Sequence, residues 1–158
     1  MGVLTPLAVR IGAIPWLPRL LPQITWFDRT LQRLTHGRLS LLGLAGLPSV
    51  LLTVRGRVSG EPRTTPLLCV RNDGHWLIAG SNFGAPSTPA WVHNLRAAPD
   101  AEISKDRWRV RVAPEELESG ERDRAWEVLC RTWPNFELYE RRTERLVPVF
   151  RLTPVSDA

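Results

Sequence analysis

A stretch of arginine, glycine and hydroxyl residues in the first half of the chain has the composition of an anion-binding turn. Residues 55–67, here called the basic turn, read Arg-Gly-Arg-Val-Ser-Gly-Glu-Pro-Arg-Thr-Thr-Pro-Leu. Gly56 and Gly60 permit a tight turn that exposes backbone amides. Arginine adds a planar fork of donors that suits phosphate and carboxylate groups. The basic turn therefore predicts a phosphodiester or oligocarboxylate ligand, with a polar hairpin turn between two strands as the alternative.

A second polar segment, residues 81–86, reads Ser-Asn-Phe-Gly-Ala-Pro. Ser81 and Asn82 carry groups that can form hydrogen bonds with the edge of a heterocycle. Thr88 and Pro89 have the chemistry of a helix start, and a helix N-terminus attracts anions. The segment fits either a ligand-binding loop or a capped connection between a strand and a helix.

Motifs of self-sufficient catalysis are absent from the sequence. It contains no G-x-S-x-G, C-x-x-C or H-E-x-x-H pattern, and its three histidines have no spacing typical of a metal site. Cys69 and Cys130 fall in apolar segments and are predicted to be core residues. We therefore expect no bound metal and infer that a borrowed cofactor carries any redox chemistry.

The elements that must position these residues are mostly strands. Apolar alternation and turn residues predict strands at residues 49–55, 65–71, 75–81, 101–104, 108–113 and 147–152. Asn72-Asp73-Gly74 is a strong hairpin signal. Helices are expected at residues 23–36, 89–99, 119–133 and 135–143. The pattern predicts an α+β, mainly β fold: an antiparallel barrel with inserted and flanking helices.

Length and charge limit the remaining possibilities. The 158 residues suit one folded domain, at residues 23–158, preceded by an apolar, basic arm at residues 1–22. The arm is too interrupted by proline to span a membrane, but it could lie on one or pack on its own domain or on a neighbouring subunit. Two cysteines and no secretory signal favour a reduced, cytoplasmic setting.

The net charge of +5 favours an anionic partner, which includes nucleic acid. Arg107, Arg109 and Arg111 alternate with apolar residues and would form a row on the open face of a strand. Such a row also fits a solvated strand face. We therefore do not expect nucleic acid to be the partner.

Taken in order, the motifs resemble the deazaflavin-dependent nitroreductase family, which has a split β-barrel fold. The resemblance rests on the basic turn, on Ser-Asn and Gly-Ala-Pro at residues 81–86, and on Pro-Ala-Trp-x-His-Asn-Leu at residues 89–95. It continues with Trp-Pro-x-Phe-x-x-Tyr at residues 133–139 and Val-Pro-Val at residues 147–149. It covers the chain from about His36 to the C-terminus.

The resemblance implies that the chain binds coenzyme F420, a hydride-carrying deazaflavin with a phospholactate and oligoglutamate tail. The implied cofactor-binding residues are Arg57, Ser59, Gly60 and Arg63 for the tail, Thr65, Pro66 and Leu67 along the channel, Ser81 and Asn82 beside phosphate or ring, and Trp91 and Asn94 on the following helix. Val58 occupies a position where the family often has lysine, so one contact to the tail is missing.

The resemblance further implies hydride transfer to a small electron-poor acceptor such as a quinone, an activated enone or a nitro compound. The acceptor pocket would be formed by Trp91, Trp133, Phe136 and Tyr139. Tyr139 and Ser81 are the candidate proton donors. Tyr139 is the only tyrosine of the chain, so the pocket is more apolar than in many family members, which favours a hydrophobic quinone or enone.

Two functional alternatives remain open at the level of the sequence, together with the oligomeric state and membrane contact. Split barrels also serve flavin mononucleotide, which would make the chain an FMN-dependent oxidoreductase. A protein without a demonstrable catalytic residue could instead be a non-catalytic deazaflavin carrier. The chain could be a monomer or a homodimer, and the arm at residues 1–22 leaves open a peripheral position at the inner face of the cell membrane.

Overall fold

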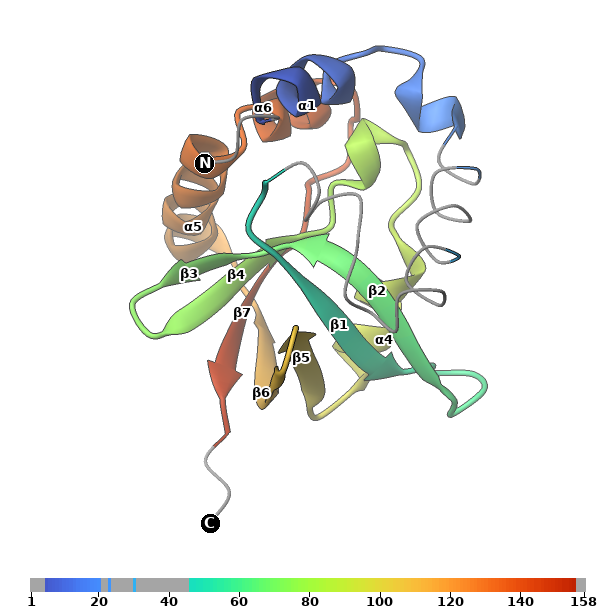
Figure 1. The fold of residues 1–158 in the computed structure, drawn as a ribbon, viewed down its shortest axis with the longest axis vertical. Coiled ribbons are helices and arrows are strands. Elements are labelled where there is room, and N and C mark those ends of the chain that lie inside the picture. Colours follow the sequence, from blue (N-terminus) through green and yellow to red (C-terminus); the bar gives the residue numbers. More distant parts are fainter. Residues whose placement is uncertain (1–4, 21–22, 24–29, 31–45, 156–158) are drawn as a thin grey trace.

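The computed structural model describes residues 5–20, 23, 30 and 46–155. Its centre is a seven-stranded antiparallel sheet with the strand order β2-β1-β5-β6-β7-β4-β3, which curls into a half-barrel (Figure 1). The strands are β1 (Ser49–Arg55), β2 (Pro62–Leu68), β3 (Val70–Asn72), β4 (His75–Ala79), β5 (Ala101–Lys105), β6 (Trp108–Glu116) and β7 (Val149–Pro154). The predicted mainly β, split-barrel architecture is confirmed.

The predicted strands differ from the observed ones chiefly at their ends. β2 begins at Pro62 because it pairs with β1 along its whole length, from Ser49 opposite Leu68 to Arg55 opposite Pro62. The strand predicted at residues 65–71 is divided at Cys69, whose amide bonds to the carbonyl of Pro48 instead of continuing a ladder. The predicted hairpin between β3 and β4 is present, and Asp73 has the positive φ that its turn requires.

Helices cover the sheet. They are α1 (Thr5–Gly12), α4 (Ala90–Ala97), α5 (Ser119–Thr132) and α6 (Asn135–Arg141), with 3-10 helices η1 (Leu17–Leu20) and η2 (Asn82–Gly84). α4 starts one residue later than the sequence indicated: Pro89 is its N-cap and no side chain caps it, so the expected Thr88 cap is not formed. The helix predicted at residues 23–36 lies outside the described residues except for Gln23 and Thr30.

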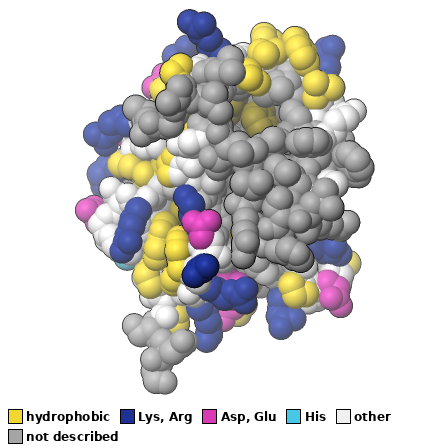
Figure 2. All heavy atoms as spheres, in the orientation of Figure 1, with side chains coloured by type: hydrophobic (Ala, Val, Ile, Leu, Met, Phe, Trp, Pro, Cys, Tyr) yellow, Lys and Arg dark blue, Asp and Glu magenta, His cyan; other side chains and the backbone are white. Residues whose placement is uncertain are grey.

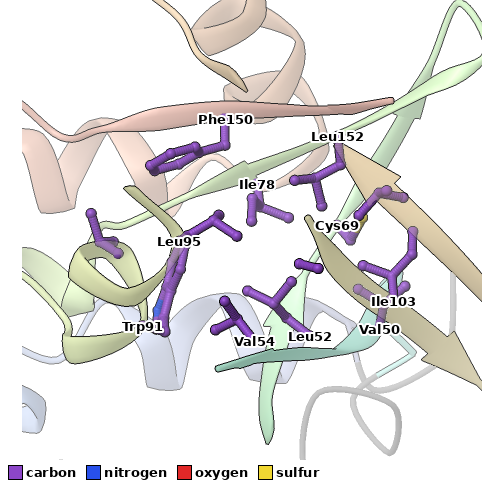
Figure 3. Packing of buried hydrophobic residues seen from close by; sticks show 13 residues of the cluster. Val50, Leu52, Val54, Cys69, Ile78, Trp91, Leu95, Ile103, Phe150 and Leu152 are labelled. Atoms are coloured by element: carbon purple, nitrogen blue, oxygen red, sulfur yellow. The ribbon is translucent and has the colours of Figure 1, made fainter. Parts of the chain in front are cut away.

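The sheet has an apolar layer on each face because side chains alternate along a strand. Inside the curl, Leu52 of β1 and Ile103 of β5 belong to one buried cluster with Trp91 and Leu95 of α4 (Figure 3). On the other face a second cluster joins β4 and β7 to α5 and α6. Trp91 lies 6.1 Å from the ring of Phe150, so the start of α4 is anchored in the first core.

The described part of the N-terminal arm lies on α6 (Figure 1). The side-chain amide of Asn135 donates to the carbonyl oxygen of Val9 at 2.7 Å, and the guanidinium of Arg142 donates to the carbonyl of Ala13. η1 lies next to η2. The arm is therefore held against its own chain by polar contacts that no local sequence pattern indicated.

Candidate functional site

Residues 56–61 of the basic turn connect β1 to β2 and are held by hydrogen bonds within the turn. The amide of Gly56 donates to the carbonyl of Glu61 at 2.8 Å, and the amide of Gly60 donates to the carbonyl of Gly56 at 2.8 Å. Gly60 has φ of +72°, a conformation that favours glycine. The hydroxyl of Ser59 accepts from the amide of Glu61 and lies 3.5 Å from Nη2 of Arg63. The turn is thus a fixed platform with exposed arginines.

One arginine of this turn is tied to α4. Oδ1 of Asn94 accepts from the backbone amide of Arg57 and from its Nη1, each at 3.2 Å. Asn94 is a buried polar residue of α4, whereas Arg57 is exposed. The contact brings two predicted cofactor-binding residues together. Farther along β2, Thr65, Pro66 and Leu67 are half-buried and pair with β1.

The second polar segment, residues 80–87, is called the Ser81 loop from here on. Asn82, Phe83 and Gly84 have φ of 48°, 54° and 79°, so three successive residues are left-handed. The side-chain amide of Asn82 donates to the carbonyl of Ser87 at 3.0 Å and therefore stabilises the loop itself. The predicted ligand-binding side chain of Asn82 is engaged within the loop.

Ser81 is placed differently. Its side chain is buried, with 9% of the residue exposed. Among the described residues, neither its hydroxyl nor the backbone amides of Ser81 and Asn82 have a hydrogen-bond partner. These three polar groups are therefore available to a polar ligand that binds at the loop.

Arg145, between α6 and β7, holds this loop from another side. Its guanidinium donates to the carbonyls of Gly80 at 3.0 Å, Ser81 at 2.9 Å and Ala85 at 3.2 Å. Burial lowers the pKa of Arg145 from its ordinary value. The sequence alone did not single out this residue because its partners lie about sixty residues upstream, and no local pattern signals such a contact.

An aromatic cluster lies next to the Ser81 loop. The ring of Tyr139 lies 5.5 Å from that of Phe83 and 6.2 Å from that of Phe136, and Phe136 lies 5.5 Å from Trp126. Trp133 and Phe136 are buried in the same cluster. Of the predicted acceptor pocket, the structure thus brings these three aromatic residues together. Trp91 instead packs in the core inside the sheet.

Tyr139 is 2% exposed, and its Oη has no hydrogen-bond partner in the described part of the chain. Burial raises the pKa of the phenol; the nearby side chains of Trp133 and Asn135 oppose that rise, although neither reaches hydrogen-bond geometry with Oη. The phenol therefore keeps its proton at neutral pH. An unpaired buried hydroxyl is a costly arrangement that calls for a functional reason.

Close backbone packing joins the loop to its neighbours. A Cβ on Gly80 would lie 2.7 Å from Cγ2 of Val92 in α4, and a Cβ on Gly84 would lie 2.7 Å from the carbonyl oxygen of Tyr139. The Ser81 loop is therefore clamped between α4, which also carries Asn94, and α6, which carries Tyr139. The two polar segments of the sequence and the aromatic motif form one region of the fold.

The two cysteines are uncharged, and two arginines of β6 are paired with acids. Burial raises the pKa of Cys69 to about 12 and that of Cys130 to about 11, so both thiols stay protonated. Two arginines of the predicted row are paired with acids: Arg109 binds Glu102 at 3.3 Å and Arg111 binds Asp100 at 2.8 Å. Within the described ranges, no cluster of His, Cys, Asp and Glu has the arrangement of a metal site.

Solved structures with this fold include F420-dependent reductases. A solved F420-H2 dependent reductase superposes with a TM-score of 0.62 at 32% identity, covering 66% of this chain and 93% of that protein. A second structure, described as a domain-swapped dimer, has a TM-score of 0.64 at 29% identity and covers 80% of this chain and 96% of the other. The predicted choice between monomer and homodimer stays a prediction.

The sequence comparisons identify the family to which the chain belongs. The family model for F420H(2)-dependent quinone reductases matches residues 26–154. An F420H(2)-dependent quinone reductase of Mycobacterium tuberculosis strain H37Rv is 34% identical over 142 residues, which cover 87% of this chain and 95% of the relative. This chain belongs to the F420H2-dependent quinone reductase family. The relation confirms the resemblance drawn from the motifs and gives no support to flavin mononucleotide as the cofactor.

Proposed function

We propose that the chain binds reduced F420 between the basic turn and the Ser81 loop and reduces a hydrophobic quinone. The observation that carries the proposal is the joint placement of Arg57, Asn94 and Ser81. Asn94 of α4 orients an exposed arginine of the basic turn, and the loop that precedes α4 carries Ser81, a buried residue whose hydroxyl has no hydrogen-bond partner among the described residues. Membership in the family and the names of its relatives point to the same cofactor.

The described residues fit the chemistry of F420. Its phosphate and carboxylate groups need cationic donors, which Arg57 and Arg63 offer at an exposed position. Its heterocycle needs polar edge contacts, for which the Ser81 hydroxyl and the free amides of the Ser81 loop are available. When bound, reduced F420 would supply a hydride.

The protein's own residues would position the cofactor and the acceptor, exclude water from them and hold the proton that the reaction needs. Trp133 and Phe136 present a buried apolar environment in which an acceptor is desolvated. Reduction of a quinone to a quinol consumes a hydride and a proton. Tyr139, whose raised pKa keeps the phenol protonated, is the proposed proton donor, with Ser81 as the alternative.

The arm adds a proposed route for a lipid-soluble acceptor. Ile11, Trp16 and Leu20 are exposed, and Arg10 and Arg19 are exposed beside them. Figure 2 shows apolar side chains gathered over the α1 to η1 segment, which lies next to η2 of the Ser81 loop. In the ranges that the structure describes, no helix has the length and apolarity of a membrane span. We propose peripheral contact with an anionic membrane.

Two experiments test these proposals. Fluorescence titration of the protein with F420 and, separately, with flavin mononucleotide should give preferential F420 binding that weakens in Arg63→Ala. Equal binding of the two cofactors, or binding of neither, would contradict the cofactor assignment.

In a flotation assay with vesicles of mixed anionic and neutral lipids, the wild-type protein should float with the vesicles. The variant in which Trp16 and Ile11 are changed to serine should not. Serine variants that float like the wild type would remove the membrane proposal alone.

A further inference from the structure

Arg145 occupies an unusual electrostatic position in this site. Among the described residues no carboxylate lies within salt-bridge distance of its guanidinium, which donates only to backbone carbonyls of the Ser81 loop. Arg109 and Arg111 of β6, by contrast, are paired with acids. A guanidinium does not lose its proton in proteins, so Arg145 is a cation that no acid neutralises.

The contacts fix the direction of two peptide units. The carbonyls of Gly80 and Ser81 accept from Nη1 and Nη2 of Arg145 at 3.0 and 2.9 Å. The described peptide bonds are all trans, and in a trans peptide the amide points opposite to the carbonyl of the same unit. The amides of Ser81 and Asn82 are therefore directed away from Arg145. Neither of these two amides has a hydrogen-bond partner among the described residues.

The same contacts support a backbone that would otherwise be unfavourable. Asn82 and Phe83 are left-handed although neither is glycine, and this conformation is unfavourable for residues that carry a Cβ. Nε of Arg145 also binds the carbonyl of Ala85 at 3.2 Å, on the far side of these two residues. The guanidinium thus bridges both ends of the left-handed segment, which a single hydrogen bond could not do.

We propose that Arg145 is a positioning residue for the cofactor site: by gripping the carbonyls of Gly80, Ser81 and Ala85 it aims the amides of Ser81 and Asn82 at the bound ligand. Its charge polarises the same two peptide units and so strengthens their amides as donors to an anionic or carbonyl oxygen. This inference rests on the proposed binding of F420 at the Ser81 loop. It assigns to Arg145 no direct contact with the cofactor.

The test compares Arg145→Lys, Arg145→Gln and Arg145→Ala with the matched pair Arg109→Lys and Arg109→Gln on the sheet. Lysine keeps the charge but carries a compact ammonium without the planar fork. We expect Arg145→Lys to weaken F420 binding about tenfold or more, and Arg145→Gln to weaken it further. The KM for a soluble quinone should stay near the wild-type value, and both Arg109 variants should bind F420 normally.

Two further readouts separate positioning from a general loss of structure. In the apoprotein, the amide resonances of Ser81 and Asn82 should shift in Arg145→Lys while those of β1 and β5 stay in place. Added methylguanidinium should restore part of the F420 affinity of Arg145→Ala, and tetramethylammonium should not. The inference would be contradicted if F420 affinity fell and the KM for quinone rose together, both in proportion to the fraction of unfolded protein.

The outcomes also distinguish this inference from the proposed function. If the wild-type protein fails to bind F420, the proposed function is wrong and the role of Arg145 fails with it. If the wild type binds F420 and Arg145→Lys and Arg145→Gln bind it equally well, the role of Arg145 alone is wrong.

Discussion

Asn94 of α4 accepts two hydrogen bonds from Arg57 of the basic turn, one from the backbone amide and one from the guanidinium, each at 3.2 Å. A single buried side-chain oxygen therefore sets both the path of the turn and the direction of one of its arginines. Because α4 follows the Ser81 loop directly, this contact also links the two polar segments of the candidate site. Phosphate and carboxylate recognition by arginine depends on such orientation.

Changing Asn94 to alanine should release Arg57. We expect F420 to bind roughly tenfold more weakly, because two hydrogen bonds that orient a charged group are lost, while kcat at saturating F420 changes little. Fluorescence titration and steady-state kinetics measure the two effects. Asn72→Ala, which removes a half-buried asparagine from the β3–β4 hairpin, is the matched control. An unchanged F420 affinity in Asn94→Ala would show that the orientation of Arg57 is irrelevant to binding.

Val58 offers a gain-of-function test. It is 89% exposed in the basic turn, so a lysine there meets no steric obstacle. Val58→Lys should tighten F420 binding about twofold to fivefold at low ionic strength, and the gain should vanish at high salt because exposed charges are screened. Val58→Gln controls for the loss of the apolar side chain. A gain that persists at high salt, or none at low salt, would place the anionic tail elsewhere.

The sequence predicted the strands of the sheet well because alternation, hairpin residues and the Gly-rich turn are local signals. It also predicted that the basic turn and the helix at residues 89–99 serve the same site, through the family resemblance. It could not predict Arg145, whose partners at residues 80–85 are brought close only by the pairing of β4 with β7. Nor could it show that Trp91 packs against Phe150 or that Asn82 binds within its own loop.

Gly84 should be far less replaceable than Gly74, although both have a positive φ. A Cβ at Gly74 meets nothing within 4 Å, whereas at Gly84 it would lie 2.7 Å from the carbonyl oxygen of Tyr139 and 2.8 Å from Cβ of Arg142. Gly74→Ala should cost about 1 kcal/mol of unfolding free energy. Gly84→Ala should cost a further ~1–3 kcal/mol from overpacking and should weaken F420 binding. Urea denaturation and titration measure both; equal costs would contradict the close packing of the Ser81 loop on α6.

Tyr139→Phe removes only a buried hydroxyl without a partner among the described residues. Since no hydrogen bond is lost, the melting temperature should stay the same or rise. If Tyr139 supplies the proton, kcat should fall by about a hundredfold or more, while the Kd for F420 stays unchanged. Thermal denaturation and stopped-flow kinetics separate the two effects. A kcat equal to that of the wild type would shift the proton donor to Ser81 or to solvent.

The central claim is that this chain oxidises reduced F420 and reduces a quinone to the quinol. The most direct test is anaerobic mixing of the full-length protein with reduced F420 and a soluble naphthoquinone, with the return of oxidised F420 followed by absorbance. We expect multiple turnovers that depend on both protein and quinone, weaken in Arg63→Ala, and do not occur with reduced flavin mononucleotide. Tight F420 binding without oxidation by any quinone would contradict the claim and identify the protein as a deazaflavin carrier.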